Sequence, residues 1–221
     1  MRTYIKYLIF SFCIFTQFVE AINSDNTIFR QTTNNLQVII DNKGRISSLT
    51  DILSQRNYLF SGNISYLLTC NLYDSDNKDG KILYPISARS IGTSKDYSII
   101  QLSFDDNINI SVKIINKKDY FRMEIINASQ IDKISHISWG PYFTTMKSPL
   151  ANWLGIARSD EFSIGIMSLD SNTDGLSPEA NIAINTDSGT SLQLHSFDQT
   201  RGRFIPSPDI HENIVYLRKS T

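Results

Sequence analysis

The sequence has 221 residues and a formal net charge of −1 at neutral pH, with 41% hydrophobic and 19% charged residues. So balanced a charge gives no electrostatic reason to expect a nucleic acid or an anionic membrane as a partner. With only 10 glycines and 6 prolines, the chain also lacks the composition of a low-complexity or linker-rich sequence.

The N-terminal segment, residues 1–21, has the layout of a secretory signal peptide. Arg2 and Lys6 precede an apolar run at residues 7–15, and Val19-Glu20-Ala21 then offers a cleavage site. The run is too short for an ordinary membrane span, although an uncleaved signal anchor is the alternative. We therefore expect a secreted, periplasmic or cell-surface protein in which residues 22–221 form one domain. Cleavage leaves Cys70 alone, so no internal disulfide is expected.

The rest of the chain reads as short runs of alternating apolar and polar residues that are separated by turn residues. The predicted strands lie, in chain order, at residues 36–40, 45–49, 57–68 (with a turn inside), 82–86, 97–104, 108–115, 120–127, 180–185, 189–197 and 214–217. One face of the 108–115 strand should be buried, through Ile108, Ile110, Val112 and Ile114. No segment keeps a helical period over three turns, so the pattern predicts an all-β sandwich or barrel.

Residues 137–175 contain the aromatic side chains on which the functional prediction depends. Their second half predicts a β-hairpin, with strands at 153–157 and 162–169 and a polar loop at 158–161. Before this hairpin, Gly140 and Pro141 interrupt the pattern, because proline cannot donate a ladder hydrogen bond and glycine loosens the backbone. We therefore expect Tyr142 and Phe143 to lie on a loop or a sheet edge. Either the aromatic rings of this stretch fill the hydrophobic core, or they form an exposed platform on which a ligand can stack.

Residues 36–51, LQVIIDNKGRISSLTD, resemble the opening hairpin of galactose-mutarotase-like β-supersandwich domains. The match is carried by Gly44, Ile46, Ser47, Ser48, Leu49 and Asp51. A second set of segments is similar to the N-terminal sandwich of large secreted bacterial glycosidase-like proteins. These segments are Trp139-Gly140-Pro141, residues 155–158, residues 162–166 and residues 191–196. The resemblance implies an antiparallel β-sandwich of the supersandwich type and a carbohydrate-related secreted protein. A catalytic barrel would follow such a sandwich and is absent from this sequence.

Catalytic chemistry has no matching pattern in the sequence. Mutarotase-like epimerases move protons with histidines and a glutamate that converge on the anomeric carbon. The histidines and glutamates do not stand in such a pattern: His136, His195, His211, Glu124, Glu161, Glu179 and Glu212. A glycosidase needs two carboxylates that face each other, whereas Asp160 and Glu161 are neighbours in one loop. No catalytic residue is assigned.

Two acidic loops offer oxygen ligands for a cation. Asp170, Asn172 and Asp174 before Gly175 fit the first half of a calcium loop, but the twelfth position is Asn181 instead of glutamate. A calcium loop of another type is the alternative to an ordinary turn rich in Asp and Asn. The second loop, with the same alternatives, contains Asp74, Asp76 and Asp79. No metal site is assigned, and we expect that no cofactor is required.

Glycan binding is the remaining chemistry, because sugars stack their apolar C–H faces on aromatic rings while polar side chains bind their hydroxyls. The predicted carbohydrate-binding residues are Trp139, Tyr142, Phe143, Trp153, Arg158 and Asp160. The first hypothesis is a non-catalytic secreted domain with an architectural role and a glycan contact. The alternatives are a stand-alone sugar epimerase or glycoside hydrolase, and an adhesion or scaffold module. The expected partner is a polysaccharide or other glycan, with no nucleic acid and no membrane after signal cleavage.

Overall fold

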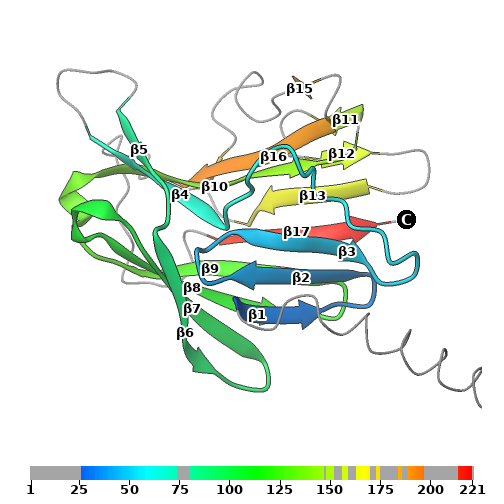
Figure 1. The fold of residues 1–221 in the computed structure, drawn as a ribbon, viewed down its shortest axis with the longest axis horizontal. Coiled ribbons are helices and arrows are strands. Elements are labelled where there is room, and N and C mark those ends of the chain that lie inside the picture. The colour runs from blue at the N-terminus through cyan, green and yellow to red at the C-terminus, as the bar shows by residue number, and fades with distance from the viewer. Residues whose placement is uncertain are drawn as a thin grey trace, which may run out of the picture.

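The computed structural model describes residues 26–73, 80–146, 148–151, 156–158, 163–169, 173–174, 184–185, 189–196 and 214–220. Within them the chain is almost entirely antiparallel β-structure (Figure 1), as predicted. The strands are β1 (Thr27–Thr32), β2 (Leu36–Asp41), β3 (Ile46–Asp51), β4 (Leu68–Leu72), β5 (Lys81–Leu83), β6 (Ser87–Thr93), β7 (Tyr97–Ser103), β8 (Asn109–Asn116), β9 (Tyr120–Ala128), β10 (Ile134–Thr144), β11 (Ser148–Ala151), β12 (Ile156–Arg158), β13 (Ser163–Ser168), β14 (Thr173–Asp174), β15 (Ile184–Asn185), β16 (Gly189–Ser196) and β17 (Ile214–Ser220). Two single-turn 3-10 helices lie at Asp105–Asn107 and Ile131–Lys133.

The strands form three sheets. A small sheet has the order β1-β2-β3, and a six-stranded sheet has the order β14-β16-β10-β4-β5, with β15 also pairing with β16. An eight-stranded sheet has the order β11-β12-β13-β17-β9-β8-β7-β6. The small sheet lies against the eight-stranded one in Figure 1, and backbone hydrogen bonds join them: Asn34 N to Lys118 O at 2.9 Å and Ala88 N to Asn42 O at 2.7 Å.

One hydrophobic core lies between the inner faces of these sheets. The alternation predicted for β8 is confirmed, because Ile108, Ile110, Val112 and Ile114 are all fully or almost fully buried. Phe121, Met123 and Ile125 continue the buried face on β9. Burying each such side chain stabilises the folded state by about 1.5–3 kcal/mol relative to leaving it in water. The core therefore holds the domain together while the cysteine described, Cys70, remains a free, buried thiol.

The predicted hairpin at residues 36–51 is confirmed as β2 and β3. Their connecting turn contains Gly44 at φ +70°, the left-handed region that glycine adopts at low cost. A Cβ at this position would lie 2.6 Å from Leu102 Cδ2 and 3.1 Å from Pro85 Cβ. The turn is therefore packed closely against the rest of the protein, and a larger residue would not fit.

Strand β10 corrects the prediction of a loop or an edge at Gly140-Pro141. This strand runs through both residues and lies between β16 and β4, inside the six-stranded sheet. The pairing with β16 shifts register between Trp139 and Tyr142, so β10 carries an extra residue there. Proline is tolerated at such a bulge because no ladder hydrogen bond is required of its nitrogen. Gly140, at φ +88°, supplies the left-handed conformation beside it.

Other predictions from the sequence were partly wrong. The segment at residues 57–67 is irregular and has only isolated bridges, so the strand predicted there begins at Leu68. β1, β6, β11 and β14 were not predicted as strands. The hairpin of β12 and β13 is confirmed, although Arg158 lies in β12, opposite Ser163, and not in the loop.

Several predictions fall outside the described residues: the signal peptide, the loop with Asp74, Asp76 and Asp79, and Asp170 and Asn172 of the other acidic loop. Among the residues that the structure does describe, no helix has the length and hydropathy needed to cross a membrane.

Candidate functional site

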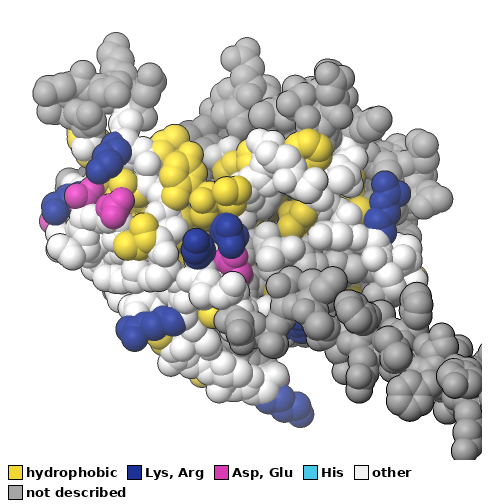
Figure 2. Space-filling model, viewed as in Figure 1, with side chains coloured by type: hydrophobic (Ala, Val, Ile, Leu, Met, Phe, Trp, Pro, Cys, Tyr) yellow, Lys and Arg dark blue, Asp and Glu magenta, His cyan; other side chains and the backbone are white. Residues whose placement is uncertain are grey.

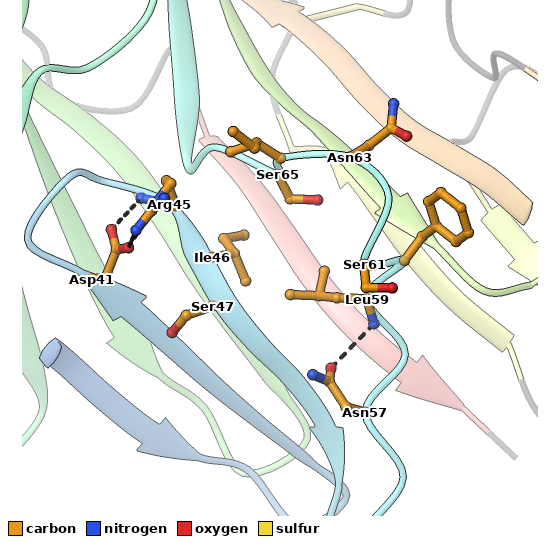
Figure 3. Close-up of a pocket in the computed structure, with 11 residues that line it drawn as sticks. Asp41, Arg45, Ile46, Ser47, Asn57, Leu59, Ser61, Asn63 and Ser65 are labelled. Atoms are coloured by element: carbon orange, nitrogen blue, oxygen red, sulfur yellow. Dashed lines mark hydrogen bonds and ion pairs between the residues drawn. The ribbon is translucent and has the colours of Figure 1, made fainter. Parts of the chain in front are cut away.

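The site that stands out is a solvent-open hollow of about 270 Å³ beside the β2–β3 hairpin (Figure 3). Its wall consists of one end of the hairpin and of the irregular segment that follows β3. The lining residues are Asp41, Arg45, Ile46, Ser47, Asn57, Leu59, Phe60, Ser61, Asn63, Ile64 and Ser65. Figure 3 shows Asp41 and Arg45 on the hairpin side, with Asn57, Leu59 and Ser61 across the hollow. A small polar and apolar surface is thus assembled from two neighbouring segments.

Asp41 organises the hairpin side of the hollow. Its Oδ1 accepts hydrogen bonds from Lys43 N at 2.9 Å and Arg45 N at 3.0 Å, and its Oδ2 accepts one from Arg45 Nε at 2.6 Å. Arg45 Nη2 lies at 2.6 Å from the same Oδ2. Asp41 is buried, whereas the Arg45 side chain is 37% exposed. The carboxylate therefore fixes the turn, while part of the Arg45 side chain remains exposed.

Asn57 organises the opposite side. Its Oδ1 accepts hydrogen bonds from Leu49 N and Leu59 N, both at 3.1 Å, so the side-chain orientation is fixed by two backbone groups. This arrangement leaves the Nδ2 group of Asn57 without a protein partner among the described residues. An exposed amide donor that is held in place in this way can bind a ligand oxygen without losing much side-chain entropy.

The hollow also has an apolar part, to which Leu59, Phe60 and Ile64 contribute. Ile64 is 52% exposed, and Phe60 is half-buried. This wall is anchored on β10, since Phe60 N donates to Phe143 O at 3.0 Å and Phe143 N donates to Ser65 Oγ at 2.9 Å. The hollow is therefore supported from behind by the six-stranded sheet.

The structure does not assemble the aromatic residues predicted to bind carbohydrate into one exposed platform. Trp139 and Tyr142 are fully buried, so their rings belong to the core and no sugar can stack on them. Burial also raises the pKa of the Tyr142 hydroxyl far above its usual range. Phe143 is half-buried behind the hollow. For Arg158 the structure describes the backbone but not the side chain, and Trp153 and Asp160 lie outside the described residues.

Of the residues weighed for catalysis, His136, His195 and Glu124 lie on the two large sheets, and His211, Glu161, Glu179 and Glu212 lie outside the described residues. His136 is half-buried on β10, with its Nδ1 3.2 Å from Ser135 Oγ, and burial lowers the pKa of its imidazole. His195 on β16 stands opposite Ser138 of β10 and Asp174 of β14 in the backbone register. Glu124 on β9 is buried, and its Oε1 lies 2.7 Å from Arg122 Nε, as an ion pair without a well-aligned hydrogen bond.

No metal centre is visible in the part of the chain that is described, where no group of three or more His, Cys, Asp or Glu side chains could hold an ion. Cys70 is buried in β4, and burial raises the pKa of its thiol to about 12. A thiol with so high a pKa remains protonated at neutral pH and is a poor nucleophile or metal ligand.

The hollow was not predicted from the sequence. Residues 41–44 were predicted only as the turn between two strands, with Gly44 as part of the resemblance at residues 36–51, and no role was given to Arg45 or Asn57. Residues 57–68 were predicted as a strand with a turn inside, and nothing in the sequence indicated that this segment faces the β2–β3 turn.

Comparisons with known proteins give a structural similarity alone. No protein-family model matches the chain, and no curated protein matches it either. Among the solved structures that match is a candidate aldose 1-epimerase from Escherichia coli K12. It is 9% identical, with a TM-score of 0.48 over 88% of this chain and 99% of that one.

Proposed function

We propose that this chain is a non-catalytic β-sandwich domain of a secreted carbohydrate-processing protein, and that it contacts a glycan at the hollow beside the β2–β3 hairpin. The observation that carries the proposal is the composition of that hollow. It holds fixed polar groups and partly exposed apolar side chains within about 270 Å³, slightly below the usual volume of small-molecule sites.

A sugar ring matches this composition because it presents hydroxyl groups around its edge and C–H groups on its faces. The partly exposed Arg45 side chain and the free Nδ2 of Asn57 offer donors for hydroxyl oxygens. Phe60 and Ile64 offer apolar surface to the C–H groups. Since the Arg45 charge is already paired with Asp41, the site favours a neutral sugar over an acidic one.

The same geometry supports a binding role over a catalytic one. Asp41 is the one carboxylate among the described residues that line the hollow, and its oxygens are occupied by Lys43 and Arg45. Glycoside hydrolysis uses two carboxylates, one of which must exchange a proton with the substrate. A carboxylate that is held by backbone and guanidinium donors serves better as a fixed support for the turn.

The resemblance seen in the sequence adds independent support. Residues 36–51 resemble the opening hairpin of galactose-mutarotase-like supersandwich domains, and this hairpin supplies Asp41, Arg45, Ile46 and Ser47 to the hollow. The secreted location of the proposal rests on the arrangement of Arg2, Lys6 and the apolar run in residues 1–21.

A glycan array followed by calorimetry with the purified protein tests the proposal. Ser61→Trp should fill the hollow from an exposed position and abolish binding. Asn57→Asp should weaken binding about fivefold or more, because it keeps the acceptor for Leu49 N and Leu59 N but removes both donors of Nδ2.

Asn127 on β9 provides the matched controls, since it is exposed and lies on the eight-stranded sheet. Asn127→Trp and Asn127→Asp should leave binding unchanged. Absence of binding to every glycan, or an equal loss in the controls, would overturn the proposed contact. Sugar epimerisation or hydrolysis by the purified protein would overturn its non-catalytic part.

A further inference from the structure

Two tyrosines form an exposed ring pair next to the hollow. The ring centroids of Tyr66 and Tyr84 are 5.1 Å apart, and the ring planes are tilted by 42°. Tyr84 is 50% exposed, Tyr66 is half-buried, and neither hydroxyl has a hydrogen-bond partner among the described residues. Exposed hydrophobic side chains gather on the face that carries β4 and β5 (Figure 2).

The backbone connects this ring pair directly to the hollow. Tyr66 follows Ser65, a lining residue, and pairs with Arg45, another lining residue, through an isolated antiparallel bridge. Ile64, which is 52% exposed, is part of the hollow wall and directly precedes Ser65 and Tyr66 in the chain. The polar hollow and the tyrosine pair therefore form one continuous surface.

The simplest structural explanation is that the tyrosines brace the short strand β5 against the segment before β4. Bracing requires only apolar contact, however, and it gives no reason for half of the Tyr84 side chain to remain in water. An aromatic ring that is fixed by its neighbour and open on one side has the form of a stacking surface, because few rotamers are lost when a ligand packs on it.

We propose that Tyr66 and Tyr84 form a second subsite of the glycan contact, so that the ligand is a neutral oligosaccharide and not a single sugar. One sugar unit occupies the hollow, and a neighbouring unit stacks on the exposed face of Tyr84. This inference rests on the proposed function, which it extends from one sugar unit to at least two. A neutral ligand is favoured because the pair is aromatic and the charge of Arg45, which lies opposite Tyr66, is paired with Asp41.

Calorimetric titration with neutral homo-oligosaccharides of glucose, xylose, mannose and galactose, from one to four units, tests the inference. The oligosaccharide that binds should do so about tenfold more tightly than its monosaccharide, since one stacked ring contributes on the order of that factor. Tyr84→Leu keeps an apolar contact with Tyr66 but removes the flat ring, and it should abolish this gain. Tyr84→Phe keeps the ring and should preserve it.

Tyr73 gives a control of the same residue type, since it is 66% exposed and follows the far end of β4. Tyr73→Leu should leave both affinities unchanged, and urea denaturation of each variant verifies that it is folded. The second subsite would be overturned if Tyr84→Leu bound the oligosaccharide as tightly as the unsubstituted protein while Ser61→Trp still abolished binding. That outcome would leave the proposed function standing. Absence of binding to any saccharide would overturn both, and tighter binding of oligogalacturonate would overturn the neutral ligand class.

Discussion

The phenolic hydroxyl of Tyr142 donates a hydrogen bond of 2.8 Å to the backbone carbonyl of Leu67, which lies 75 residues earlier in the chain. Both side chains are fully or almost fully buried. The bond joins β10 to the residue that precedes β4, directly behind the segment that lines the hollow. A residue that was predicted to lie on a loop or sheet edge and to bind carbohydrate is therefore a structural support of the candidate site.

Truncation of Tyr142 should accordingly destabilise the protein. Tyr142→Ala should lower the free energy of unfolding by about 3–5 kcal/mol, the usual effect of removing a large buried aromatic side chain. Tyr142→Phe removes only the hydroxyl and should lower it by about 0.5–1.5 kcal/mol, because Gly140 N still donates to Leu67 O at 3.3 Å. Urea denaturation measures both values. An unchanged free energy of unfolding in Tyr142→Ala would show that the ring is not in the core.

Gly44 should tolerate no side chain. Gly44→Ala places a Cβ in the left-handed region, within 2.6 Å of Leu102 Cδ2, and should lower the free energy of unfolding by about 1–3 kcal/mol. The control is Gly92→Ala on β6, where the added Cβ would meet Ile99 at an ordinary 3.5 Å. Thermal denaturation should show a lower Tm for the first variant only, and equal Tm values would contradict the close packing of the turn.

The thiol of Cys70 should resist modification in the folded protein. It is buried, and its pKa of about 12 keeps it protonated at neutral pH. Ellman's reagent should therefore react with Cys70 slowly in native buffer and at once in guanidinium chloride. Rapid stoichiometric reaction of Cys70 in the native state would contradict the burial of β4.

His136 should make stability fall in mild acid. Burial lowers the pKa of the folded imidazole below its ordinary value of 6.5, which the unfolded chain retains. As the pH falls through 6.5, the unfolded state takes up a proton that the folded state does not, so the free energy of unfolding decreases. Urea midpoints between about pH 7.5 and pH 5 should fall less in His136→Gln than in the unsubstituted protein. Parallel curves would exclude His136 as a source of the pH dependence.

The sequence predicted individual strands well where neighbours pair through short turns, as in β7, β8 and β9. It failed at Gly140-Pro141, because a proline breaks a strand pattern unless a bulge relieves it, and the bulge depends on the pairing with β16. The hollow was missed for a similar reason. Arg45 and Tyr66 become neighbours only through an isolated bridge, and no local pattern encodes such a contact.

Strand β17 joins two parts of the eight-stranded sheet, since it pairs with β13 on one side and with β9 on the other. The β6–β9 meander closes through short turns and forms quickly, whereas the pairing of β9 with β17 must close a much longer loop. During folding, β9 and β13 therefore expose unpaired edges until β17 docks between them. Unpaired edges can pair with strands of other molecules, so aggregation of this protein should start from the partly folded sheet. Its extent should depend on how quickly β17 docks between β9 and β13.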